Sequence, residues 1–244
     1  MKYINIKKKS LIGCVILINF ILLLNIKSLD NFCNDKSVIM GITDIFSYCS
    51  KASIISIFII PTVVFFFQNE IGNYSVNIII RKSRSSIWQK EIVKSIIFSL
   101  INSSVSTIML LVVGLLMKLP FNTWNQNNSL YFYIVHEKLS ISGIKIIFGY
   151  LIYMFLCFVV TTSIIILSDW VFDNKTYGWI LIFIISIADS FGHLDIFYKR
   201  FSIYYSDWKN QNIYFGFIIP LLWFLIIMVI GVINEKRKDF YKWK

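Results

Sequence analysis

Six apolar segments, separated by charged or asparagine-rich stretches, determine what this chain can fold into. A bilayer core about 30 Å thick is crossed by about 20 apolar residues in a helix. With 57% hydrophobic and only 15% charged residues, the composition excludes an ordinary soluble domain. We therefore predict an all-α integral membrane protein of one domain, with six transmembrane helices at residues 11–26, 52–67, 92–119, 144–167, 177–191 and 213–233.

The first, second and fifth predicted spans are short, so each must use flanking residues or locally thinner lipid. Four lysines precede the first span, as in the basic start of a signal peptide. No small-x-small cleavage site follows that apolar run, which favours an uncleaved first span.

Lysine and arginine counts in the loops predict the orientation of the chain. One side of the predicted topology carries 15 of these residues and the other carries 9. Both termini are therefore predicted to be cytoplasmic. The net charge of +11 is explained by this topology and by attraction to anionic membrane lipid. The basic residues are divided among separate loops and form no nucleic-acid-binding module, so no nucleic-acid partner is expected.

The sequence contains no motif for catalysis, for a cofactor or for a metal. The phosphate-binding loop G-x-x-x-x-G-K-[ST], the zinc motif H-E-x-x-H and the hydrolase motif G-x-S-x-G are all missing. The two histidines, His136 and His193, fall in different predicted outer loops. We expect this chain not to be an enzyme. Cys33 and Cys49 share a predicted outer loop, and their spacing does not decide whether they form a disulfide.

The outer side of the predicted topology contains two aromatic stretches. Residues 191–214 interleave aromatic and charged side chains, which favours either an interfacial or re-entrant segment between spans five and six or an aromatic belt. A second stretch after Leu119 is richer in asparagine, and a peptide or lipid could contact it. Asp189 either has a proton or substrate role or marks the end of its helix. The candidate substrate or re-entrant residues are Asp189, Phe197, Tyr204 and Trp208.

The cytoplasmic loop at residues 68–91 is longer than a simple connection requires. It passes from Glu70 through the apolar "YSVNIII" to the basic "RKSR" and then to Trp88 and Lys90. This order fits an amphipathic element along the membrane surface. Arg81 and Arg84 share a helical face and can donate forked hydrogen bonds. The alternative is a positively charged topology anchor that contacts lipid headgroups.

The stretch from Glu70 through "IIIRKSRSSIWQKEIVKS" resembles the first cytoplasmic loop of small permease subunits of ABC-2 type exporters, in particular the lantibiotic and bacteriocin immunity group. The resemblance implies a plasma-membrane permease of a Gram-positive bacterium that expels an antimicrobial peptide or another amphipathic substrate. It also implies two copies of a separate ABC ATPase, which holds ATP and Mg, and a second permease subunit, identical or related. The implied ATPase-coupling residues are Glu70, Arg81, Arg84, Trp88 and Lys90.

A different class of function also fits the sequence. The chain could be a non-transporting membrane sensor or immunity scaffold that binds peptide or lipid through its aromatic outer loops. Replacements at Trp88 or Glu70 distinguish the two classes, because only a coupling loop requires these residues to link ATP hydrolysis to export.

Overall fold

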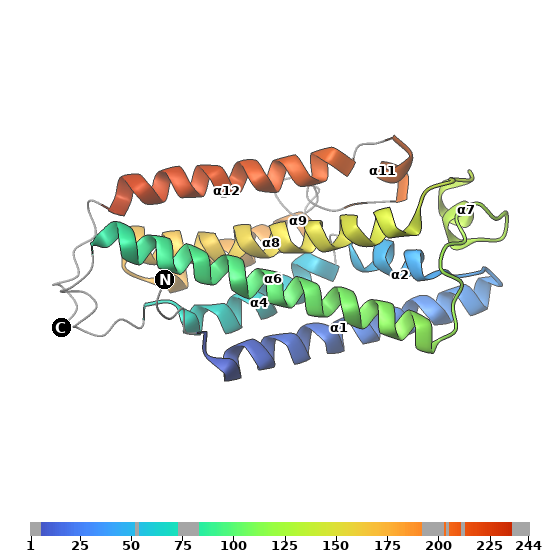
Figure 1. Cartoon of the computed structure of the whole chain (residues 1–244), viewed down its shortest axis with the longest axis horizontal. Coiled ribbons are helices and arrows are strands. Elements are labelled where there is room, and N and C mark those ends of the chain that lie inside the picture. The colour runs from blue at the N-terminus through green and yellow to red at the C-terminus, as the bar shows by residue number, and fades with distance from the viewer. Residues whose placement is uncertain are drawn as a thin grey trace.

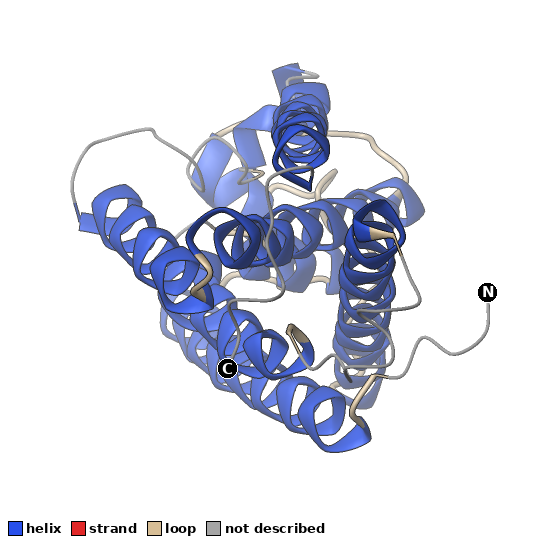
Figure 2. Cartoon of the chain, turned by 90° about the vertical axis from the view of Figure 1, so that its left-hand side faces the viewer, coloured by secondary structure: helices blue, strands red, loops and turns tan. Residues whose placement is uncertain are grey.

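The computed structural model of the protein describes residues 6–51, 54–72, 83–191, 203, 205–210 and 213–235. Within these ranges the chain is helical and contains no β-strand, apart from one isolated bridge between Ile39 and Ser129. Figure 2 shows the helices grouped into one bundle, seen from the end at which α6 begins. The long helices are α1 (Lys8–Lys36), α6 (Arg84–Leu116), α8 (Gly143–Phe172), α9 (Lys175–Phe191) and α12 (Ile213–Glu235).

The second predicted span contains two helical pieces, η1 (Ile55–Ile59) and α4 (Ile60–Phe67), and the turn η2 (Gln68–Glu70) follows at the start of the predicted loop. The η1 segment is a π-helix that immediately precedes α4, whose second residue is Pro61. Proline has no N–H to donate within a helix, and a π-turn is one way to accommodate that loss. Three short helices complete the described fold: α2 (Ile42–Cys49), α7 (Leu130–Val135) and α11 (Tyr205–Asn210).

Helices occur at all six predicted positions, and four of them are long and apolar enough to cross a bilayer. These four are Lys8–Lys36, Arg84–Leu116, Gly143–Phe172 and Gly216–Asn234. The segments Ile57–Glu70 and Lys175–Ala188 are apolar but shorter. The outward faces of α1, α6 and α12 are rich in exposed isoleucine, leucine and valine. These features indicate a helical membrane protein.

The central helix of the bundle is α8. Of its most apolar 18 residues 67% are buried, against 22 to 39% for the other three helices that are long and apolar enough to cross a bilayer. It packs against α2, α4, α6, α9 and α12, and Figure 1 shows it between α6 and α12. The start of α1, the end of α4, the start of α6 and the end of α12 lie at one end of the bundle, at the left of Figure 1. Helices α2, α7 and α11 lie toward the other end.

The interface between α6 and α8 is polar. Ser95 of α6 lies 2.6 Å from the hydroxyl of Thr162 and 3.4 Å from that of Ser163. Small residues let two helices approach closely in a membrane, where packing and hydrogen bonds rather than hydrophobic burial hold helices together. Ser95 belongs to a polar stripe along one buried face of α6, formed by Ser95, Ser99, Asn102, Ser103, Ser106 and Thr107.

Two local expectations differ from the structure. The loop predicted for residues 68–91 ends earlier, because α6 begins at Arg84 and the Ser83 hydroxyl caps it by accepting a hydrogen bond from the Ser86 N–H. Cys33 lies in the last turns of α1 rather than in a loop, since that helix continues to Lys36. Cys33 and Cys49 are both buried and free, so they form no disulfide.

Candidate functional site: a lysine-capped turn and a buried tryptophan

The turn Gln68–Glu70 is tied to three other helices by lysine side chains, and we call it the capped turn. The last carbonyl groups of a helix have no partner within that helix and carry partial negative charge, which favours a nearby cation. Here three consecutive carbonyl oxygens each accept a hydrogen bond from a lysine ammonium group. The donors are Lys175 to Gln68 at 2.7 Å, Lys7 to Asn69 at 2.8 Å and Lys94 to Glu70 at 3.3 Å.

These three lysines come from different parts of the bundle. Lys7 is the N-cap residue of α1, Lys94 lies in α6, and Lys175 is the first residue of α9. Charge-assisted hydrogen bonds are shorter and stronger than neutral ones. A displacement of the capped turn therefore acts on α1, α6 and α9 together.

Glu70, one of the predicted coupling residues, is only 3% exposed. Its Oε2 atom accepts a hydrogen bond from the Lys7 backbone N–H at 3.0 Å. Its Oε1 atom is buried and has no hydrogen-bond partner among the described residues. The ammonium group of Lys94 also donates to the fully buried Glu91 carboxylate at 3.1 Å. Lys94 thus joins the capped turn to a buried acidic side chain of α6.

Trp88 is buried where α6, α8 and α12 meet. Its side chain is 1% exposed and its ring packs edge to face on Trp170 of α8, with ring centres 5.3 Å apart. On its other side it lies against Gly231 of α12, where an added Cβ would come within 1.8 Å of Trp88 Cζ2. Only a residue without a side chain fits at this position of α12. Trp88 is therefore a buried contact between three helices and does not belong to a surface loop.

The remaining predicted coupling residues have different surroundings. Arg84 is exposed at the first position of α6, and Lys90 is half-buried two turns further on. Arg81 lies outside the described residues. The structure thus places Glu70 and Trp88 inside the bundle and Arg84 on its surface. Sequence reasoning did not assign a site role to Lys7, Lys94 or Lys175, because lysines near apolar runs were counted only for topology.

At the opposite end, the predicted residue Trp208 lies in α11 and is 5% exposed. It packs edge to face on Trp124, which stacks on Tyr131 at 4.5 Å between ring centres. Asp189 lies in α9, and its side chain is outside the described part of the structure. Phe197 and Tyr204 also lie outside the described residues.

Asp44 is a buried acid of this end that sequence reasoning did not single out. Its carboxylate accepts hydrogen bonds from the Trp124 indole at 2.8 Å, the Gly41 N–H at 2.7 Å and the Thr123 hydroxyl at 3.1 Å. The Tyr205 hydroxyl donates to its backbone carbonyl at 3.2 Å. Burial raises the pKa of Asp44 to about 6, against the opposing effect of these donors. Asp44 therefore links three chain segments that are distant in sequence.

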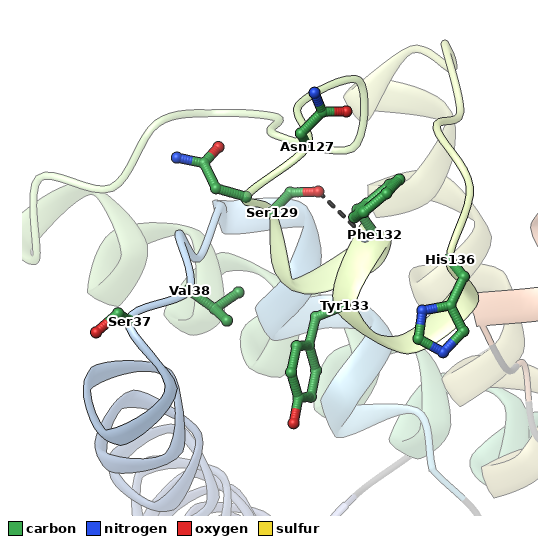
Figure 3. A pocket seen from close by; sticks show the side chains of 8 residues that line it. Ser37, Val38, Asn127, Ser129, Phe132, Tyr133 and His136 are labelled. Atoms are coloured by element: carbon green, nitrogen blue, oxygen red, sulfur yellow. Dashed lines mark hydrogen bonds between the residues drawn. The ribbon is translucent and has the colours of Figure 1, made fainter.

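A pocket of about 210 Å³, which we call the outer pocket, opens between the end of α1 and the start of α7 (Figure 3). The bridge between Ile39 and Ser129 supports it, and the Ser129 hydroxyl accepts a hydrogen bond from the Phe132 N–H at 3.1 Å. None of its lining residues is an acid, a lysine or an arginine. The lining residues are Ser37, Val38, Asn127, Asn128, Ser129, Phe132, Tyr133 and His136.

Across the described ranges, no three histidine, cysteine, aspartate or glutamate side chains lie close enough together to hold a metal ion. No protein-family model matches the chain, and neither does any curated protein or solved structure.

Proposed function

We propose that this chain is the membrane-spanning permease half of an ATP-driven exporter of the ABC-2 type. The observation that carries the proposal is the capped turn, whose three carbonyl groups are bound by lysines of α1, α6 and α9. A separate ATPase that docks on the 68–91 segment would move this turn when its subunits close on ATP. The hydrogen bonds from the lysines to the carbonyl groups would then transmit the movement to three helices at once.

The buried Trp88 extends this linkage to the rest of the bundle. Because its ring fills the space between Trp170 and Gly231, a shift of the first turns of α6 would also move α8 and α12. Protein interiors are packed too tightly to deform continuously, so such a shift switches between two discrete packings. Arg84, exposed at the start of α6, would contact the ATPase itself.

In the proposed assembly both termini are cytoplasmic and the chain crosses the plasma membrane of a Gram-positive bacterium six times. The short helices at Ile57–Glu70 and Lys175–Ala188 would cross with the help of flanking residues or thinner lipid. A second permease, identical or related, and two ATPase copies holding ATP and Mg would complete the exporter. An apolar exterior around a polar stripe suits an amphipathic cargo, such as a cationic antimicrobial peptide.

The test is to purify the tagged chain from gently solubilised native membranes and to measure ATP hydrolysis and peptide export in the same vesicles. We expect a stoichiometric ATPase partner. Lys175→Met should lower export per ATP hydrolysed while leaving the complex assembled, because it removes one contact of the capped turn. The control is Lys209→Met, which breaks an exposed ion pair with Glu137 at the other end. A chain that purifies without any ATPase would contradict the proposal.

A second candidate is a non-transporting sensor or immunity scaffold, and the outer pocket is the observation that favours it. Amide, hydroxyl and aromatic groups around an open pocket suit a neutral peptide segment. This function requires peptide binding to the isolated chain but no ATPase. Tyr133→Ala would weaken such binding in the absence of ATP, whereas Lys175→Met would have no effect on it.

A further inference from the structure

Three buried polar atoms without partners surround one small void near α2, α8 and α11. They are the Ser47 hydroxyl of α2, the Tyr150 hydroxyl of α8 and the Trp208 indole nitrogen of α11. The three residues are 2%, 2% and 5% exposed, and none of these atoms has a hydrogen-bond partner among the described residues. Buried polar groups are nearly always hydrogen-bonded, so three unpaired atoms around one void require an explanation.

The chemistry of the void limits what can bind there. Its lining contains no charged side chain, and its apolar walls are Phe46, Ile146 and Ile203. The indole N–H can only donate a hydrogen bond, and both hydroxyl groups can donate. The matching group is therefore an uncharged acceptor oxygen attached to an apolar chain. A phosphate or carboxylate is disfavoured, because no cation lines the void to offset the loss of its hydration.

Ile203 and Trp208, from the segment that contains α11, line the void together with α2 and α8. The void has no room for a water molecule. The Ser50 hydroxyl donates to the Ile203 carbonyl at 3.0 Å, and the Tyr205 hydroxyl donates to the Asp44 carbonyl at 3.2 Å. Two hydrogen bonds thus hold the segment around α11 against α2 and the residue that follows it. A small outward shift of α11 would open the void and let these atoms pair.

The position of the void along α8 indicates which chemical group of a lipid lies at the same level. Helix α8 has 30 residues and is about 45 Å long, whereas the hydrocarbon core is about 30 Å thick. Tyr150 lies about 10 Å along α8 from its start at Gly143. A centred α8 therefore places Tyr150 at the boundary between hydrocarbon and headgroups. The acyl ester carbonyls of lipids lie at this boundary.

We propose that this void is a binding site for the ester carbonyl of a diacyl lipid in the leaflet at this end of the bundle. Trp208 and Tyr150 donate hydrogen bonds to the carbonyl oxygen, Ser47 supplies a third donor, and the adjoining acyl chain lies against Phe46 and Ile146. The site does not depend on an ATPase partner, so it stands or falls separately from the exporter proposal.

The test compares two lipids with the same headgroup and chain length on the full chain in detergent. One is a diacyl phosphatidylglycerol, and the other is its dialkyl ether analogue, which lacks the carbonyls. Lipid retained by the protein is measured by native mass spectrometry over a titration. We expect the ester lipid to bind about fivefold more tightly than the ether lipid, the effect of a net hydrogen bond. Equal binding of the two lipids by the unaltered chain would overturn the proposal.

Two variants assign the preference to this site. Trp208→Phe and Tyr150→Phe each remove one donor and should each lower ester-lipid binding by part of the fivefold preference, about twofold, without changing ether-lipid binding. Tyr177→Phe, at an exposed tyrosine of α9 far from the void, is the control and should change neither. In lipid-free detergent Tyr150→Phe should melt no lower than the unaltered chain, since it removes an unpaired buried group. An ester preference that is undiminished in both variants would place lipid binding elsewhere and refute the site.

Discussion

Replacing Gly231 by alanine tests whether Trp88 holds α6 and α12 together. On helix propensity alone, alanine would stabilise this position of α12 by about 1 kcal/mol. The new Cβ, however, would lie 1.8 Å from Cζ2 and 2.3 Å from Cη2 of Trp88. The ring cannot swing away freely because Trp170 packs against it. Overpacking of this kind costs about 1 to 3 kcal/mol, and the short distance favours the upper part of that range. We expect a net destabilisation of about 2 kcal/mol.

Thermal unfolding in detergent, followed by tryptophan fluorescence, measures this effect. The decisive comparison repeats Gly231→Ala in a chain that carries Trp88→Leu, where the clashing ring atoms are gone. There alanine should be neutral or stabilising, so the two changes should be strongly non-additive. Val232→Ala, at a 47% exposed neighbour on the outer face of α12, is the control and should change stability little. If Gly231→Ala were as stable as the unaltered chain with Trp88 present, the reasoning would be refuted.

Three further changes test other contacts in the same unfolding assay. Lys94→Met should cost about 1.5 to 3 kcal/mol, because it removes the ammonium group that pairs with the buried Glu91 carboxylate and donates to the Glu70 carbonyl, whereas Lys209→Met should cost at most about 1 kcal/mol, and equal losses would contradict this. The pKa of Asp44 is higher in the folded chain, at about 6, than its ordinary value of 3.8, so folding takes up protons there. The contribution of Asp44 to the free energy of unfolding is largest below about pH 4. It falls by up to about 3 kcal/mol as the pH rises through 6, and Asp44→Asn should abolish this dependence. Ser95→Leu should cost about 1 to 3 kcal/mol by forcing α6 from α8, and unchanged stability would show that this contact is loose.

The positions of the helices could be predicted from the apolar runs. A helix that crosses a bilayer must be long and apolar, and both properties can be read directly from the sequence. The start of α6 was predicted eight residues too late, at Ile92 instead of Arg84. Charged residues such as Lys90 and Glu91 suggested a loop at the surface. In the structure Glu91 is fully buried and pairs with Lys94 one turn later. A hydropathy pattern does not reveal that two charges neutralise each other inside a bundle.

The candidate site was only partly predictable for a related reason. Glu70 and Trp88 were interpreted as residues of a surface segment, whereas both are buried. The lysine contacts of the capped turn join positions more than 60 residues apart for Lys7 and more than 100 apart for Lys175. Each donor binds a backbone carbonyl, which every residue possesses. No spacing or motif in one sequence can identify such a pair, since the acceptor has no sequence signature.

The polar stripe of α6 shows how the bundle could combine a firmly tied end with movable helices. Small or hydroxyl residues recur at every fourth position, from Ser95 through Ser99 and Ser103 to Thr107. Ser95 has one hydroxyl partner at 2.6 Å and a second at 3.4 Å on α8. A hydroxyl group can rotate to a new partner without unpairing a charge, so a small shift of α6 along α8 exchanges hydrogen bonds at little net cost. The lysines of the capped turn, by contrast, bind fixed carbonyls through charge-assisted bonds. A force applied at the capped turn would therefore pass into the helices without breaking these bonds, and α6 would respond by sliding along the stripe.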